Sequence, residues 1–211
     1  HSGPSPSRLR GPVSSTLDAG TSKYTSMQLV WPALEHLPSY VAALKTGWSA
    51  DNVRGAAAAN EELARIELNP AAFIAGMVDR EARGDPVKLP DGSLVNRIPG
   101  FRRWMWDGEF CGAIGFRWQP GTEALPPHCL GHIGYAVIPA KRNRGFATEA
   151  VKLTLPLAKA EGLQFVELTT DLDNLASQRT IVKAGGVLHE QFDKPSQFGG
   201  KPGLRYRILL L

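Results

Sequence analysis

The sequence contains only two cysteines, Cys111 and Cys129, in 211 residues. Two cysteines cannot build the disulfide framework of a small secreted protein, so we expect a compartment that keeps thiols reduced. No apolar run is long enough to cross a membrane, and the first residues lack the apolar core of a signal peptide. We therefore expect a soluble, cytoplasmic protein without a membrane partner.

An excess of charge of one sign is also missing. The chain has 24 Lys and Arg against 20 Asp and Glu, a formal net charge of +4, and this small excess argues against a nucleic-acid partner. The histidines and cysteine between His128 and His132 match no zinc-binding spacing, so no metal is expected. Because no Gly-Lys-Ser/Thr follows a glycine turn, a P-loop phosphatase is disfavoured.

Residues 1–26 are dominated by Ser, Gly, Pro and Thr and have no helical or strand periodicity. We expect a disordered tail there and a single domain over residues 27–211. The chain begins with His1, and Met27 opens the first patterned segment. The tail is therefore either native or added for expression, and a native mass that includes residues upstream of Met27 would decide for the first.

What the chain does have is an ordered series of apolar patterns. A strand is expected over residues 27–34, then helices over 37–48, 51–68 and 70–82, and a loop with a short hairpin over 84–99. Strands over 101–106 and 110–118 flank the turn dipeptide Asp107-Gly108. There follow a strand over 131–138, a helix over 146–162, a strand over 165–170, a short helix from 174 to 184, and strands over 187–192 and 204–211. This order predicts an α/β (α+β) fold with a mixed, mostly antiparallel sheet of about seven strands and helices on both faces.

The segment over residues 131–162 predicts an anion-binding turn. Its apolar strand stops at Pro139, and Arg142, Gly145 and Ala147 follow with the spacing R-x-x-G-x-A. A glycine lets the backbone approach a ligand closely, and the helix that begins at Phe146 offers free N–H groups and a positive dipole end. An ordinary strand–loop–helix junction with solvated arginines remains the alternative. Gly134, inside the strand, suggests a bulge or a close ligand approach.

In this order of elements, the turn resembles the pyrophosphate-binding motif Q/R-x-x-G-x-G/A of the GNAT superfamily of N-acetyltransferases. A second family segment, an Asn that leads a short helix ending in K-x-G, resembles the run from Asn174 and Ser177 to Lys183 and Gly185-Gly186. The resemblance covers residues 27–211 and is strongest over 131–186. Within the superfamily, the chain looks like the branch near the ribosomal-protein N-acetyltransferases.

The resemblance implies that acetyl-coenzyme A (acetyl-CoA) is the co-substrate and that its acetyl group passes to a primary amine by direct attack on the thioester. It implies pantetheine contacts from Tyr135, Ala136 and Val137, and a polar contact near the thioester from Asn174 and Ser177. The implied pyrophosphate contacts come from Arg142, Asn143, Arg144, Gly145, Phe146, Ala147 and Thr148. The identity of the amine acceptor and the presence of a homodimer stay open.

The chain departs from the family at Ile181, where many members have a tyrosine that protonates the leaving thiolate. The candidate catalytic residues are therefore His132, Glu149 and Ser177, with Asp171, Asp173 and Tyr135 as further options. We favour His132 as base or relay, because histidine titrates nearest neutral pH and this one lies in the strand that should line the cleft. A structural histidine, a helix-dipole partner at Glu149 and helix-capping residues remain the alternatives. The missing tyrosine also leaves open a GNAT-fold module that binds coenzyme A with little or no turnover.

Overall fold

A computed structural model describes residues 26–89 and 91–211 of the chain. The expected tail over residues 1–26 lies outside this range except for Ser26. Within the described residues, no helix combines the length and the apolar character needed to span a bilayer.

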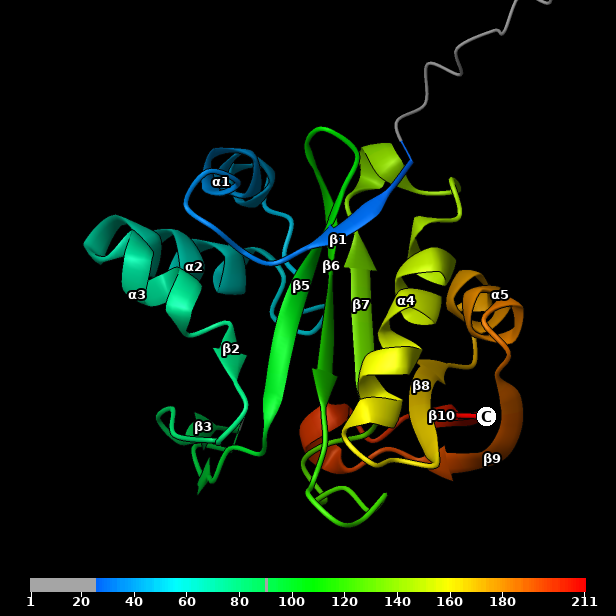
Figure 1. Cartoon of the computed structure of the whole chain (residues 1–211). Coiled ribbons are helices and arrows are strands. Elements are labelled where there is room, and N and C mark those ends of the chain that lie inside the picture. The colour runs from blue at the N-terminus through cyan, green and yellow to red at the C-terminus, as the bar shows by residue number, and fades with distance from the viewer. Residues whose placement is uncertain (1–25, 90) are drawn as a thin grey trace, which may run out of the picture.

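The helices and strands follow the expected order along the chain with one exception (Figure 1). The helices are α1 (Leu37–Lys45), α2 (Ala56–Leu68), α3 (Pro70–Ala75), α4 (Phe146–Ala160) and α5 (Leu175–Lys183), with 3-10 turns at Pro139–Lys141 and Ser196–Phe198. The strands are β1 (Gln28–Val30), β2 (Val78–Asp79), β3 (Val87–Lys88), β4 (Leu94–Val95), β5 (Gly100–Trp106), β6 (Phe110–Arg117), β7 (Ile133–Val137), β8 (Phe165–Asp171), β9 (Val187–Asp193) and β10 (Pro202–Leu209). The third helix, expected over residues 70–82, ends at Ala75, and strand β2 follows it because Val78 and Asp79 pair with β5. The helix-and-strand composition predicted from the sequence is confirmed.

The strands form two main sheets instead of one continuous sheet. One has the order β1-β5-β6-β7, with β2 also paired to β5, and the other has the order β8-β10-β9. The pairings within both sheets are antiparallel. Strands β3 and β4 form the short hairpin expected over residues 84–99. The division between β7 and β8 is the feature of the fold that positions the candidate site.

The sheet that contains β5 and β6 has a hydrophobic cluster on each face. Side chains alternate between the two faces along β5. Phe101 and Met105 lie on the face covered by α4 and α5, and Trp104 lies on the face covered by α1, α2 and α3. Tyr40 of α1 stacks on Trp104 with ring centroids 4.6 Å apart. Figure 1 shows these two groups of helices on opposite sides of the central strands. The expectation of helices on both faces is therefore confirmed.

The second helix begins later than its sequence pattern indicates. Expected from residue 51, α2 starts at Ala56, because the Asp51 carboxylate accepts the backbone N–H groups of Val53 and Arg54 at 3.0 and 2.9 Å. An Asp side chain that bonds its own backbone in this way favours a turn over a helix. The loop before α2 is thereby kept beside β7 as part of the groove described below.

Candidate active site

A groove of about 1040 Å³ opens where β7 separates from β8. Its walls come from β7, the turn before α4, the end of β8, the first turns of α5, and the loop between α1 and α2. Segments that are far apart in the sequence therefore meet in one space. A cavity of this size with converging polar groups is the usual form of a small-molecule site.

The two sheets are joined at the closed end of the groove by His132. Its backbone N–H donates to the Glu167 carbonyl at 2.8 Å, and its Nδ1 accepts the Glu167 N–H at 2.9 Å. The imidazole Nδ1 thus accepts the Glu167 N–H that a backbone carbonyl of a neighbouring strand would otherwise accept. Gly131 permits the close approach, because a Cβ there would lie 2.9 Å from the Glu167 carbonyl oxygen.

Beyond this junction, one edge of β7 faces the groove. Strand β6 pairs with the other edge: Arg117 N–H donates to the His132 carbonyl, and Ile138 N–H donates to the Cys111 carbonyl, both at 2.9 Å. Because backbone groups alternate in direction along a strand, those of Tyr135 and Val137 point away from β6 into the groove. This edge can pair with an extended ligand as a neighbouring strand would.

The turn before α4 has the backbone conformation of an anion cradle. Asn143 has a φ of 61° and Gly145 a φ of 79°, and Gly145 is the N-cap of α4. The first turn of a helix leaves its N–H groups without intrahelical acceptors and carries the positive end of the helix dipole. An added Cβ at Gly145 would meet no heavy atom within 4 Å, so the backbone conformation, and not crowding, requires glycine there.

The three basic residues of this turn have different surroundings. Arg142 lines the groove, and its Nε donates to the Val137 carbonyl at 3.2 Å. Lys141 is held by Asp107 and Glu109 at 2.9 and 2.7 Å. Arg144 is absent from the groove lining and donates to the Ala140 carbonyl at 3.3 Å. Of the three, Arg142 is the one whose guanidinium is both in the groove and free of a carboxylate.

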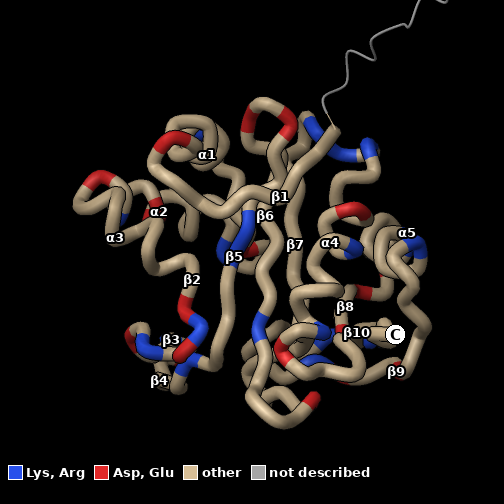
Figure 2. Tube along the Cα trace, viewed as in Figure 1, with Lys and Arg blue, Asp and Glu red and all other residues tan. Residues whose placement is uncertain are grey.

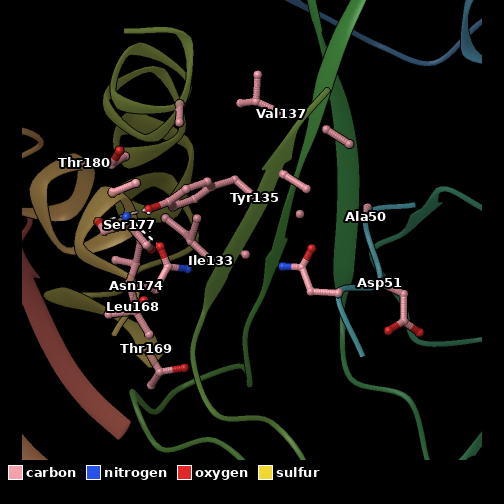
Figure 3. A pocket seen from close by; sticks show the side chains of 18 of the residues that line it. Ala50, Asp51, Ile133, Tyr135, Val137, Leu168, Thr169, Asn174, Ser177 and Thr180 are labelled. Atoms are coloured by element: carbon pink, nitrogen blue, oxygen red, sulfur yellow. Dashed lines mark hydrogen bonds between the residues drawn. The ribbon is translucent and has the colours of Figure 1, made fainter. Parts of the chain in front are cut away.

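A hydroxyl pair lies across the groove from that turn. Tyr135 Oη is 2.9 Å from Ser177 Oγ and also donates to the Ser177 carbonyl at 3.3 Å. The Asn174 side chain caps α5 by accepting the Ser177 N–H at 3.0 Å, which fixes the first turn of the helix. Burial raises the pKa of Tyr135, so it keeps its proton at neutral pH. Figure 3 shows Tyr135 of β7 extending toward Ser177 and Asn174.

The opposite wall of the groove lies on the other side of β7. Figure 3 places Ala50 and Asp51, from the loop between α1 and α2, across the strands from Ser177. Arg102 of β5 and Arg117 of β6 line this side together with Gly115 and Gly134. The pairing of Gly115 with Gly134 is unbroken, so the bulge considered for Gly134 is absent. The Arg117 guanidinium instead lies over it, 3.1 Å from where a Cβ would stand.

Two residues considered for catalysis lie outside the groove lining. His132 is fully buried, and burial lowers its pKa to about 4, so the ring is neutral at physiological pH. Glu149 is exposed on the first turn of α4, where the positive end of the helix dipole stabilises a carboxylate. Of His132, Glu149 and Ser177, only Ser177 lines the groove; among the further options, Tyr135 and Asp171 also line it and Asp173 does not.

Sequence reasoning missed the arginines of the second wall, Arg102 and Arg117. Arg117 belongs to no motif, and its direction depends on strand register. One local pattern could have indicated it: alternate residues of β6 are Ala113, Gly115 and Arg117, so two small side chains and one cation share a face.

Residues 92–187 match the family model described as an acetyltransferase (GNAT) domain. Over these residues, which are just under half of the chain, the sequence is similar to a GNAT acetyltransferase domain. The match spans β4 to the start of β9, and so includes β7, the turn before α4, and α5. It confirms the family inferred from those residues. The co-substrate of this family is the acetyl-CoA expected from the sequence.

Solved acetyltransferase structures share the fold of this GNAT domain. The microcin C7 self-immunity acetyltransferase MccE, in complex with acetyl-CoA and AMP, has a TM-score of 0.56 at 13% identity, covering 87% of this chain and 92% of its own. RimL, a ribosomal L7/L12 α-N-protein acetyltransferase in complex with coenzyme A, has 0.56 at 14%, covering 88% and 95%. The Salmonella typhimurium acetyltransferase that modifies the N-terminal serine of L7/L12 has 0.56 at 13%, covering 88% and 95%. Among curated proteins, none matches the chain by sequence. These likenesses confirm the GNAT fold.

Proposed function

We propose that this protein transfers the acetyl group of acetyl-CoA to a primary amine by direct attack on the thioester. The observation that carries the proposal is the meeting, in one groove, of the free edge of β7 with the cradle before α4. Pantetheine has amides that can pair with a strand edge, and pyrophosphate is the anion that such a cradle suits. Coenzyme A bound in RimL and acetyl-CoA bound in MccE support the same ligand.

In this proposal, Arg142 and the N–H groups of residues 145–148 hold the pyrophosphate. Tyr135 and Val137 hold the pantetheine arm through their backbone groups. The polarity of the groove agrees with an anionic ligand. Its acidic lining residues are Asp51 and Asp171, and Asp171 is paired with Lys194. Outside the wall formed by β5 and β6, the basic lining residues are Lys141, Arg142, Arg179, Lys183 and Lys194.

The reaction needs three events at the thioester. The neutral amine nitrogen attacks the carbonyl carbon, and the resulting oxyanion is stabilised by a backbone N–H of β7. The C–S bond then breaks, and the thiolate takes a proton from the Ser177 hydroxyl, whose position is fixed by Tyr135 and the Asn174 cap. The proton lost from the amine passes to solvent. Ser177 recovers its proton from water through the open groove.

The choice of amine follows from the groups at hand. No histidine lines the groove within the described residues, and Asp51 is occupied by the turn it caps. Without a strong base, the acceptor must already be partly neutral. An α-amino group, with a pKa of about 8, meets this condition near neutral pH far better than a lysine side chain with a pKa of about 10.4. The proposal therefore favours the N-terminus of a peptide or protein chain.

An acetylation assay tests this function. Purified protein is incubated with acetyl-CoA and short peptides that have a free α-amine, and thiol release and the mass of each peptide are followed. We expect thiol release that depends on the peptide, with one acetyl group added at its N-terminus. Peptides whose α-amine is blocked but which contain lysine should react slowly. Equal thiol release with and without peptide would contradict the proposal.

The second candidate function is a module that binds coenzyme A with little turnover, favoured by Ile181 where many family members have a tyrosine. The Ser177 hydroxyl argues for the enzyme, because it supplies a proton donor one helical turn earlier on the same helix. Binding of acetyl-CoA without acetylation of any α-amine or lysine peptide would decide for the module.

A further inference from the structure

The acceptor wall of the groove contains a cation that the proposed chemistry does not use. Arg117 ends β6 and reaches over Gly134, on the side of β7 opposite Tyr135. Figure 2 shows the basic segments of β5 and β6 on these central strands, where Arg102, Arg103 and Arg117 are the basic residues. The coenzyme cradle lies across β7, at the turn before α4.

The neighbouring acidic groups are bound elsewhere. Glu62 accepts from the Tyr40 hydroxyl and pairs with Arg102 at 3.4 Å. At the closed end of the groove, Glu167 pairs with Arg205 at 3.5 Å and with Arg207 at 2.8 Å. Glu123 accepts the Gln164 N–H at 3.1 Å.

Arg117 itself makes no salt bridge with a carboxylate in residues 26–89 or 91–211. Burial raises the pKa of the nearby Cys129 thiol, which therefore stays neutral and cannot balance the guanidinium. A half-buried cation without a partner attracts an anion more strongly than a fully hydrated one.

Two glycines, Gly115 and Gly134, lie next to Arg117 on the same face of the sheet. Arg102, Gly115 and Gly134 are register partners in a row across β5, β6 and β7. The Arg117 guanidinium lies over Gly134, whereas a Cβ at Gly115 would come no closer than 3.9 Å to any heavy atom, so a ligand can lie against the backbone at Gly115 between the two guanidinium groups. Arginine, with its planar array of donors, suits a carboxylate or a phosphate in such a position.

We propose that Arg117 selects amine acceptors that carry a carboxylate or a phosphate close to the reacting amine. Arg102, already partly balanced by Glu62, supplies additional positive potential. This inference rests on the proposed acetyl transfer, because it assigns the acceptor to this wall. It predicts that the preferred acceptor is an acidic N-terminal segment, that neutral and basic counterparts of this segment bind weakly, and that a small anionic amine binds more tightly than its neutral match.

Binding, measured apart from turnover, tests the inference. Protein saturated with coenzyme A is titrated in a calorimeter with the peptide Ser-Asp-Asp-Ala-Ala-amide and with its neutral match, Ser-Asn-Asn-Ala-Ala-amide. A second pair, ethanolamine phosphate and ethanolamine, separates phosphate from carboxylate. We expect the anionic member of at least one pair to bind about tenfold tighter or more. Equal affinities within both pairs would overturn the inference, whether or not the protein acetylates amines.

Two variants of Arg117 test whether this residue causes the preference for anionic acceptors. Arg117→Gln should reduce the anionic preference to within about twofold while leaving coenzyme A affinity unchanged, and Arg117→Glu should favour Ser-Lys-Lys-Ala-Ala-amide. Arg103→Gln is the matched control, because Arg103 donates to the Leu29 carbonyl and packs on Trp31 instead of facing the groove. It should keep the wild-type preference. A preference that survives Arg117→Gln would overturn the assignment.

Discussion

Arg142 and Arg144 are two residues apart, but their side chains lie in different places. Arg142 is in the groove and bonds the Val137 carbonyl, whereas Arg144 bonds the Ala140 carbonyl outside it. A sequence motif cannot separate them, because both fit a basic turn. Side-chain direction, which the turn geometry decides, makes only Arg142 a strong candidate for contact with the pyrophosphate.

Replacement of each arginine tests this difference. We expect Arg142→Ala to weaken coenzyme A binding about tenfold or more, because a charge-assisted hydrogen bond is lost. Arg144→Ala should change the affinity less than about twofold. Calorimetric titration with coenzyme A measures both. Equal losses in the two variants would mean that the turn acts only through its overall charge.

Replacing Ser177 is predicted to lower the catalytic rate more than replacing Tyr135. Ser177→Ala should lower kcat by about 100-fold, the scale of a lost general acid, with little change in the KM for acetyl-CoA. Tyr135→Phe should lower kcat less, because it removes only the bond that orients Ser177. Steady-state thiol release measures both constants. A Ser177→Ala enzyme with wild-type kcat would exclude Ser177 as the proton donor.

Helix α4 begins and ends with glycines in the left-handed region. Gly145 at its start has a φ of 79°, and Gly162 beyond its end has a φ of 88°, with no heavy atom within 4 Å of a Cβ at either. Each glycine should therefore contribute similarly to stability. The two differ in that only Gly145 shapes the cradle.

Alanine at either position should cost about 1 to 3 kcal/mol of unfolding free energy through backbone strain. We expect Gly145→Ala also to weaken coenzyme A binding several-fold, because the backbone N–H groups lose their convergence. Gly162→Ala should leave this affinity unchanged. Denaturant unfolding and calorimetry on both variants measure the two effects. A parallel loss of affinity in Gly162→Ala would attribute the effect to stability alone.

His132 belongs to the junction between the two sheets, and its protonation should weaken that junction. The unfolded histidine takes up a proton near pH 6.5, whereas the buried ring stays neutral down to about pH 4. The unfolded state therefore binds more protons in this interval, and the free energy of unfolding falls as the pH falls. The full effect of this one group is on the order of 3 kcal/mol.

The variant His132→Asn keeps a hydrogen-bond acceptor but cannot titrate. We expect it to be less stable than wild type at pH 7 and to lose less stability between pH 6.5 and pH 4. Thermal unfolding at a series of pH values measures this difference. If both proteins showed the same dependence on pH, the buried ring would not be the group responsible.

At the scale of the whole molecule, two antiparallel sheets meet at β7 and β8 and then diverge. The turn before α4 and the Asn174 cap were predictable, because each depends on a few residues close in sequence. The separation of the sheets was not, because it depends on the pairing of β8 with β10. Gly134 was indicated by the sequence, but Arg117 meets it and the loop at Asp51 only through strand register and helix packing, so sequence patterns could not place this arginine in the groove.

If the proposed function is right, coenzyme A occupies the gap between β7 and β8. Hydrogen–deuterium exchange of the backbone amides, with and without coenzyme A, measures this occupancy. We predict strong protection of the amides of Tyr135 and Val137 and of residues 145–148, with little change in the distant strands β3 and β4. Unchanged exchange in β7 and in the turn before α4, at saturating coenzyme A, would contradict the claim.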